Sequence, residues 1–199
     1  MEKISIHQTK EIYNRELEYL EEGILNSKNP YHFFSLSTLN FDHPESRTIV
    51  LRDIKKKPLK ILFNADFRSP KVKQLIKNPN CAALFYDNNR KMQLRFKCQS
   101  IINHKNKLSK KIWGNTPLQS RKCYMGDYSP SELTNCWEPN IPDKYLKKDP
   151  ERVDSESGYE NFTAIELFIM ATDILELHHD GHIRFSLDTS KREISFIAP

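Results

Sequence analysis

The chain has 199 residues, of which 38% are hydrophobic and 29% charged, so it can bury a sizeable core and should be soluble. Its net charge of +5 comes from 31 basic and 26 acidic residues spread along the sequence. The densest basic runs, 55–57 and 105–111, lack the interleaved aromatic residues of a nucleic-acid platform, so nucleic-acid binding is not expected.

The four cysteines, Cys81, Cys98, Cys123 and Cys136, form no C-x-x-C pair, and no histidine stands at zinc-finger spacing, so no metal site is expected. Cys81 and Cys98 lie in strand-like apolar segments and are expected to be buried thiols in a reducing compartment. The N-terminus has no apolar signal-peptide core, and no apolar run approaches the length of a membrane span. These features predict a cytoplasmic protein that does not enter a membrane.

The first half of the chain combines two helices with short strands. Residues 7–27 repeat apolar side chains at helical spacing and predict an amphipathic N-terminal helix. Ser69 and Pro70 are typical of a helix start and predict a short helix over 69–78. Aromatic and β-branched runs predict an antiparallel meander followed by a hairpin. The strands expected here are 31–40, 46–54, 59–65, 81–87 and 92–102.

The second half is expected to begin with helices over 105–125, broken at Asn115-Thr116-Pro117. Residues 126–160 have little periodicity and predict a long loop, either functional or disordered. Residues 161–199 return to strands, with Asp180-Gly181 as a hairpin turn. The sequence has no βαβ rhythm and no glycine-rich phosphate loop, which disfavours a Rossmann or P-loop fold. We therefore expect one mainly β domain over 1–199: an antiparallel barrel with its core at 31–103 and peripheral helices.

One short stretch, S-R-T-I-V-L-R-D-I at 46–54, raises a question of function. In an extended strand, the five-residue spacing of Arg47 and Arg52 puts them on opposite faces. They are either ordinary surface cations or part of an anion site built onto the sheet.

Several motifs favour the anion site because they occur together and in order. R-x-V-x-L-[KR] is matched at 47–52, S-x-K at 69–71, Asn-Pro at 78–79 and a strand glutamine at Gln93. The chain's end resembles R-x-H-D-R-F and a terminal L-A-P. With these motifs, residues 31–125 and 174–199 resemble the pyridoxamine 5′-phosphate oxidase family, the FMN-binding split barrels.

The resemblance implies an FMN-binding homodimer with a split-barrel fold and the flavin between its subunits. Arg47 and Lys71 would meet the FMN phosphate, Gln93 would bond the isoalloxazine edge, and Arg184 would lie near the ring. His178 falls where these oxidases usually have a tryptophan. The residues that the resemblance assigns to FMN are Arg47, Thr48, Ile49, Val50, Leu51, Arg52, Phe63, Asn64, Arg68, Ser69, Lys71, Gln93, His178 and Arg184.

The chemistry of these residue types agrees with a phosphate site. Arg47 offers a planar fork and Lys71 a mobile point charge, and the start of the 69–78 helix adds free N–H groups. Each residue also has a plainer interpretation: Gln93 could belong to a polar strand face, and Arg184 could pair with Asp173 or Asp188. His178 and His179 would point to opposite faces of a strand and so could not chelate one ion together. Trp113, Tyr124 and Trp137 are expected to be packing residues.

The substrate half of the site departs from the family. Where the oxidases bind the substrate phosphate, this chain has Arg52, Ile112, Thr116 and Gln119, and Asp180 replaces an arginine. Arg52 and His182 remain as candidate substrate-binding residues. The departures place the chain in an oxidase-like subgroup.

Three functions remain open. The first is an FMN-dependent oxidoreductase of a small-molecule substrate. The others are a true pyridoxamine or pyridoxine 5′-phosphate oxidase, and a non-catalytic flavin- or haem-binding barrel. Residues 126–160 could close over the ligand, and Tyr128 and Ser129 fall loosely where the oxidases place a Gln-Ser pair.

Overall fold

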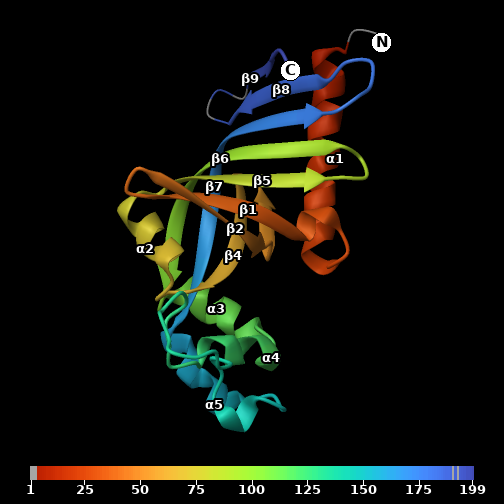
Figure 1. Cartoon of the computed structure of the whole chain (residues 1–199). Helices are drawn as coiled ribbons and strands as arrows, with labels where there is room; N and C mark the ends of the chain where they lie inside the picture. Colours follow the sequence, from red (N-terminus) through yellow and green to blue (C-terminus); the bar gives the residue numbers. More distant parts are fainter. Residues whose placement is uncertain (1–3, 190, 192) are drawn as a thin grey trace. The chain divides into compact units, whose positions relative to one another are not determined.

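A computed structural model describes residues 4–189, 191 and 193–199 (Figure 1). Contacts divide the chain into two compact units, which are described separately. The first unit comprises residues up to 63, 78–101 and 166 onward, and the second comprises 64–77 and 102–165. The unit boundaries at 63/64, 101/102 and 165/166 fall inside strands β4, β6 and β7.

The described elements follow the order that the sequence predicts: a helix, strands, a short helix, strands, helices and strands. The helices are α1 Ile6–Leu25, α2 Pro70–Lys77, α3 Lys107–Asn115, α4 Leu118–Arg121 and α5 Arg152–Ser155. Short 3-10 helices are η1 Pro30–His32, η2 Lys122–Tyr124, η3 Asp143–Tyr145 and η4 Glu156–Glu160. The strands are β1 Phe33–Asn40, β2 His43–Val50, β3 Asp53–Lys56, β4 Leu59–Asp66, β5 Asn80–Asp87, β6 Met92–His104, β7 Phe162–Glu176, β8 Ile183–Asp188 and β9 Glu193–Phe196.

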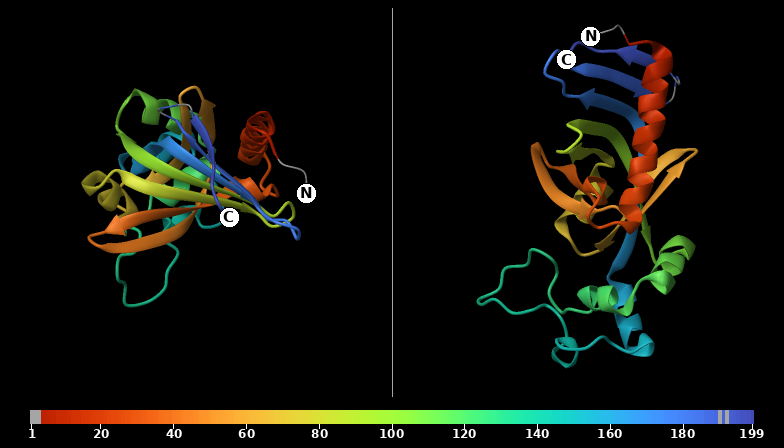
Figure 2. Two further views of the ribbon diagram at one scale, coloured as in Figure 1. Left: turned by 90° about the horizontal axis from the view of Figure 1, so that it is seen from above. Right: turned by 90° about the vertical axis from the view of Figure 1, so that its right-hand side faces the viewer.

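The strands form one sheet in the order β2-β1-β5-β6-β7-β4-β3, in which β8 also pairs with β7, and β9 pairs with β8. The pairs β1–β2, β1–β5, β3–β4, β5–β6, β7–β8 and β8–β9 are antiparallel. Both views of Figure 2 show α1 beside the strands of the first unit. The expected class, mainly antiparallel β with several helices, is confirmed.

The stretch 46–54 is not one strand. β2 ends at Val50 and pairs with β1, whereas β3 begins at Asp53 and pairs with β4. The link between them is bonded on both sides: Leu51 N–H donates to the His32 carbonyl at 2.9 Å and Arg52 N–H to the Leu62 carbonyl at 2.8 Å. Since β2 and β3 end the strand order, this link joins the two ends of a curled sheet. The prediction of a continuous meander, with Arg47 and Arg52 on opposite faces of one strand, is wrong.

Alternating residues of β1, β5 and β6 build the core of the first unit. Phe34 stacks on Phe85 at 5.0 Å between ring centroids, and Phe63 and Phe96 complete an aromatic cluster around them. Each of these four rings is at most 2% exposed. Because strand side chains alternate, the opposite face of β5 carries Leu84 and Tyr86 into solvent.

Glu16 fixes α1 to the sheet. Its carboxylate is 1% exposed and accepts hydrogen bonds from Arg90 Nη1 at 2.8 and 2.9 Å, from Arg15 Nε at 3.0 Å and from the Tyr31 hydroxyl at 2.8 Å. Arg90 also pairs with Asp87 and lies 3.7 Å from the centre of the Tyr19 ring. A buried carboxylate is stable only with such partners.

Gly23 permits a close approach between α1 and the following chain. A Cβ at this position would lie 2.8 Å from the Tyr31 carbonyl carbon and 2.9 Å from its oxygen, both backbone atoms. We expect Gly23→Ala to lower the free energy of unfolding by about 1–3 kcal/mol, because overpacking must displace backbone. Gly114→Ala is the matched control, since a Cβ there meets nothing within 4 Å. It should be neutral or stabilising by up to about 1 kcal/mol. Denaturant unfolding measures both, and equal effects would contradict the packing argument.

Arg121 organises the second unit. Its side chain is fully buried and donates to Glu156 Oε1 at 2.7 Å, to Ser155 Oγ at 3.0 Å and to the Trp113 carbonyl at 2.6 Å. The Trp113 ring, 2% exposed, packs on the Tyr124 and Phe162 rings. The packing roles of Trp113 and Tyr124 are therefore confirmed. Sequence periodicity did not reveal Arg121.

Residues 126–160 are only partly a loop, because they include η3, α5 and η4. Two hydrogen bonds join Asn140 to the backbone of Tyr128 within the remaining loop. Asn140 Nδ2 donates to the Tyr128 carbonyl at 2.7 Å, and Asn140 Oδ1 accepts from Tyr128 N–H at 3.1 Å. Trp137, between these two residues in the sequence, is 87% exposed, so its expected packing role is wrong.

β7 ends at Glu176, before the two adjacent histidines. The expectation that His178 and His179 alternate on a strand is therefore wrong. Across the described residues, no group of three or more His, Cys, Asp or Glu side chains is arranged to hold a metal ion. The same residues include no helix with the length and apolar composition to cross a membrane.

Candidate functional site

Arg47 lies in β2 with its guanidinium held by the β1–β2 hairpin. Nη1 donates to Thr38 Oγ1 at 2.5 Å, to the Leu36 carbonyl at 3.2 Å and to the Glu45 carbonyl at 3.0 Å. Nη2 donates to Glu45 Oε2 at 3.2 Å. Burial lowers the Arg47 pKa and the Glu45 carboxylate opposes this shift, but an arginine keeps its charge at neutral pH. The hairpin therefore presents an oriented cation.

The segment before α2 concentrates polar groups in the second unit. The buried Ser69 hydroxyl donates to the Asp66 carbonyl at 2.7 Å and accepts from Lys71 Nζ at 3.4 Å. Arg68 binds both carboxylate oxygens of Asp66, with Nε at 3.1 Å and Nη2 at 2.8 Å. These hydrogen bonds raise the Arg68 pKa and balance its charge locally. Lys71 adds a second cation to this segment, next to the Ser69 hydroxyl.

Asn64, at the end of β4, carries a buried atom in need of a partner. Its Oδ1 has no hydrogen-bond partner within the described parts of the chain. The preceding Phe63 is fully buried in the aromatic core, so its side chain serves packing. An unsatisfied buried polar atom costs about 1–3 kcal/mol. A ligand that donates a hydrogen bond to Asn64 would remove this cost.

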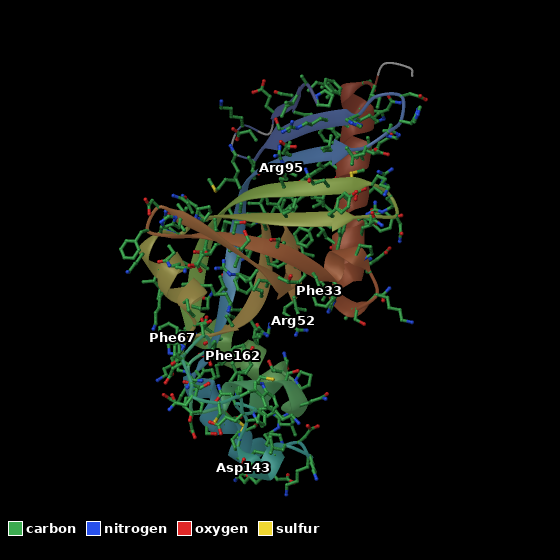
Figure 3. All side chains as sticks on the ribbon, in the orientation of Figure 1. Phe33, Arg52, Phe67, Arg95, Asp143 and Phe162 are labelled. Atoms are coloured by element: carbon green, nitrogen blue, oxygen red, sulfur yellow. The ribbon has the colours of Figure 1, made fainter. Side chains whose placement is uncertain are left out.

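Arg52 (Figure 3) follows β2 and has an exposed side chain. The described residues give its guanidinium no ion pair or hydrogen bond. It is therefore available to a ligand, although its backbone N–H serves the closure of the sheet.

Arg184, on β8, forms an ion pair with Asp173, one of the two pairings that the sequence offered as an alternative to a flavin contact. Its Nε and Nη2 donate to the Asp173 carboxylate at 3.2 and 2.9 Å. Arg95 of β6, labelled in Figure 3, pairs with the same carboxylate. One acid thus joins two arginines from separate strands. Gln93 lies two residues before Arg95 on β6, opposite Tyr86 of β5.

Acid should weaken the Asp173 cluster. Burial alone raises the Asp173 pKa, but hydrogen bonds from Arg184 and Arg95 outweigh it and hold the pKa below its ordinary value. A carboxylate with a lowered folded-state pKa stabilises the fold above its unfolded pKa of about 3.9, and this stabilisation is lost as pH falls through the folded value. We expect Asp173→Asn to lose less stability than the wild type between about pH 6 and pH 3. Urea unfolding at both pH values measures this, and identical losses would contradict it.

The β7–β8 turn brings together His178, a predicted flavin-site residue, and His182, a predicted substrate-site residue. His178 N–H donates to His182 Nδ1 at 3.2 Å, and His178 Nε2 lies 3.1 Å from Glu176 Oε1. The candidate substrate residue His182 therefore also orders the turn.

Each unit holds part of the predicted set. The first unit carries Arg47, Thr48, Ile49, Val50, Leu51, Arg52, Phe63, Gln93, His178, His182 and Arg184, and the second carries Asn64, Arg68, Ser69 and Lys71. Sequence reasoning missed Asp66 as the partner of Arg68, and it left Asp173 as one of two possible partners of Arg184. The Asp66–Arg68 spacing could have indicated the first pair, whereas the second depends on strand pairing.

The antiparallel sheet with its helices has the fold of the FMN-binding split barrels. Residues 15–104 match the model of the family described as pyridoxamine 5′-phosphate oxidase, FMN-binding domain. The match covers this part of the chain, and the domain that it describes binds FMN.

Several solved structures share the fold. A pyridoxamine 5′-phosphate oxidase-related, FMN-binding protein from Nostoc punctiforme is 20% identical, with a TM-score of 0.70 over 94% of this chain and 96% of that one. PhzG from Burkholderia lata, in complex with tetrahydrophenazine-1-carboxylic acid, is 14% identical, with a TM-score of 0.70 over 96% and 92%. Campylobacter jejuni ChuZ is 9% identical, with a TM-score of 0.56 over 98% and 65%. No curated protein matches the chain.

Each unit holds side chains of the kind that FMN needs. A phosphate needs fixed donors and positive charge. Arg47 is a held cation of the first unit, and Lys71 lies in the first turn of α2 in the second unit. The unsatisfied Asn64 Oδ1 suits a donor such as a ribityl hydroxyl.

Proposed function

We propose that the protein is an FMN-dependent oxidoreductase that acts on a small-molecule substrate in the cytoplasm. FMN supplies the redox chemistry when bound, while the protein orients it and tunes its surroundings. The observation that carries the proposal is the oriented guanidinium of Arg47 within an FMN-binding domain. In this proposal Arg47 and Lys71 hold the phosphate, Asn64 accepts from the ribityl chain, and Gln93 and Arg184 contact the ring.

Two side chains of the second unit disfavour pyridoxamine 5′-phosphate as the substrate. Thr116 stands where the oxidases have a phosphate-binding arginine, and its hydroxyl donates to the Ile112 carbonyl at 2.9 Å. The nearby Arg121 is fully buried and engaged with Glu156, Ser155 and Trp113. Neither side chain offers a free donor to a second phosphate, so we expect a different substrate.

Anaerobic reduction of the bound flavin tests the function. FMN-loaded protein would be mixed with pyridoxamine 5′-phosphate and, separately, with panels of small amines, alcohols and reduced nicotinamides, and bleaching of the flavin absorbance recorded. We expect no bleaching by pyridoxamine 5′-phosphate and bleaching by at least one other donor. Turnover of pyridoxamine 5′-phosphate would identify a true oxidase. Bleaching by dithionite alone would favour the non-catalytic alternative.

We also propose a homodimer that uses the open face of the sheet. Phe33, Leu84 and Tyr86 lie on the adjacent strands β1 and β5 and are 45%, 38% and 41% exposed. Neighbouring exposed apolar side chains of this kind are typical of interfaces between proteins.

Light scattering tests the proposed dimer. We expect twice the chain mass for the wild type and a shift toward the monomer for Tyr86→Lys, because a buried charge opposes association. Ile76→Lys, at a 56% exposed position of α2, is the matched control and should remain dimeric. A monomeric wild type that binds FMN tightly would contradict the proposal.

A further inference from the structure

Two cysteines face each other across neighbouring strands of the first unit. Cys81 of β5 is the direct antiparallel partner of Cys98 of β6. Directly opposed residues have Cα atoms about 4.5–5.5 Å apart, depending on the type of pair. A disulfide requires about 4.4–6.8 Å between the same atoms. The register therefore places these two thiols at the separation that a cross-strand disulfide needs.

The two thiols differ in access. Cys98 is 3% exposed, whereas Cys81 is half-buried, so the expectation that both are buried is wrong for Cys81. The Cys98 Sγ lies 3.6 Å from the Phe96 carbonyl oxygen. A hydrogen bond with Cys81, together with burial, raises the pKa of the Cys98 thiol. Cys98 thus stays protonated while Cys81 meets reagents from solvent first.

We propose that Cys81 and Cys98 form a reversible disulfide when the protein meets hydrogen peroxide. The Cys81 thiolate attacks one peroxide oxygen, the O–O bond breaks, and the released hydroxide is protonated to water, leaving a sulfenic acid on Cys81. The Cys98 sulfur then attacks the Cys81 sulfur, loses its proton, and displaces the hydroxyl group as a second water molecule. Two thiols are oxidised and one peroxide is reduced. A reducing thiol reverses the reaction by exchange.

The remaining cysteines provide an internal comparison. Cys123 and Cys136 are both exposed and belong to the second unit. If exposure alone governed oxidation, they would react before Cys81. If the opposed geometry governs it, the less exposed pair closes first, because its second step is intramolecular. The proposal does not depend on bound FMN or on the enzymatic activity.

The test is peptide mapping of the full-length protein. The protein is treated with a small excess of hydrogen peroxide, its remaining thiols are alkylated under denaturing conditions, and it is digested and analysed by mass spectrometry. We expect a peptide pair joined through Cys81 and Cys98, lighter by two hydrogen atoms than the two reduced peptides together and lost after dithiothreitol. Cys98→Ser should instead accumulate sulfenic acid on Cys81, trapped by dimedone. The Cys123→Ser/Cys136→Ser control should form the joined peptide as the wild type does.

Two results would overturn the proposal. One is a wild-type map in which Cys81 and Cys98 remain alkylated while Cys123 and Cys136 are oxidised. The other is a disulfide that joins Cys81 to a thiol other than Cys98. The wild-type map decides the question even if a serine variant fails to fold.

Discussion

Arg47→Ala combined with Lys71→Ala is expected to weaken FMN binding by about 100-fold or more. Each substitution removes charge-assisted hydrogen bonds worth about 1.5–3 kcal/mol, and each 1.4 kcal/mol corresponds to about tenfold in affinity. The hairpin orients Arg47 in the first unit, and Lys71 is a point charge near a helix start in the second unit. Titration of the flavin-stripped variant with FMN, followed by flavin fluorescence, measures the loss.

Matched controls separate the phosphate site from general electrostatics. Lys73→Ala removes an exposed lysine from the same helix as Lys71, and Lys55→Ala removes one from β3. Both should leave FMN affinity within about twofold of the wild type, since long-range surface charges are screened. Arg47 also holds Thr38 and Glu45, so circular dichroism must show that the double variant is folded. A folded double variant with wild-type affinity would refute the site assignment.

Glu16→Ala should lower the free energy of unfolding by about 3–5 kcal/mol, the usual cost of breaking a buried ion pair by removing one partner. Glu16 is 1% exposed, and its loss removes the carboxylate that binds Arg90 and the Tyr31 hydroxyl. Denaturant unfolding measures the change. Glu18→Ala, on the exposed face of the same helix, should change stability by no more than about 0.5 kcal/mol. Equal effects of the two variants would show that Glu16 does not anchor the helix.

The local elements of this fold follow from short-range signals in the sequence. Residues 69–78 became α2 because Ser69-Pro70 starts a helix and Asn78-Pro79 ends it. The alternation in 80–104 became the β5–β6 hairpin, with Met92, Leu94 and Phe96 inward. Such features depend on neighbours in the chain, which a single sequence displays.

The predictions from sequence are wrong where contacts between distant residues determine the structure. The apolar run 46–54 is divided because Leu51 bonds to His32 of η1, just before β1, whereas Arg52 bonds to Leu62 of β4. No local residue marks this division, since neither glycine nor proline stands there.

The cations of the candidate site show the same distinction. The order of the motifs predicts where these cations lie in the sequence, whereas the fold determines which acidic side chains pair with them. Asp173 meets Arg95 and Arg184 because β6, β7 and β8 are neighbours. The structure was therefore needed to show whether a predicted cation already has an acidic partner.

The most direct test of the account compares FMN with riboflavin. The purified, flavin-stripped wild type would be titrated with each flavin, and quenching of flavin fluorescence recorded. The two ligands differ only in the phosphate, so the ratio of their dissociation constants isolates the phosphate site. We predict tight FMN binding and riboflavin binding weaker by about 100-fold or more, in line with the charge-assisted bonds expected from Arg47 and Lys71. Equal affinity for both flavins, or binding of neither, would contradict the account.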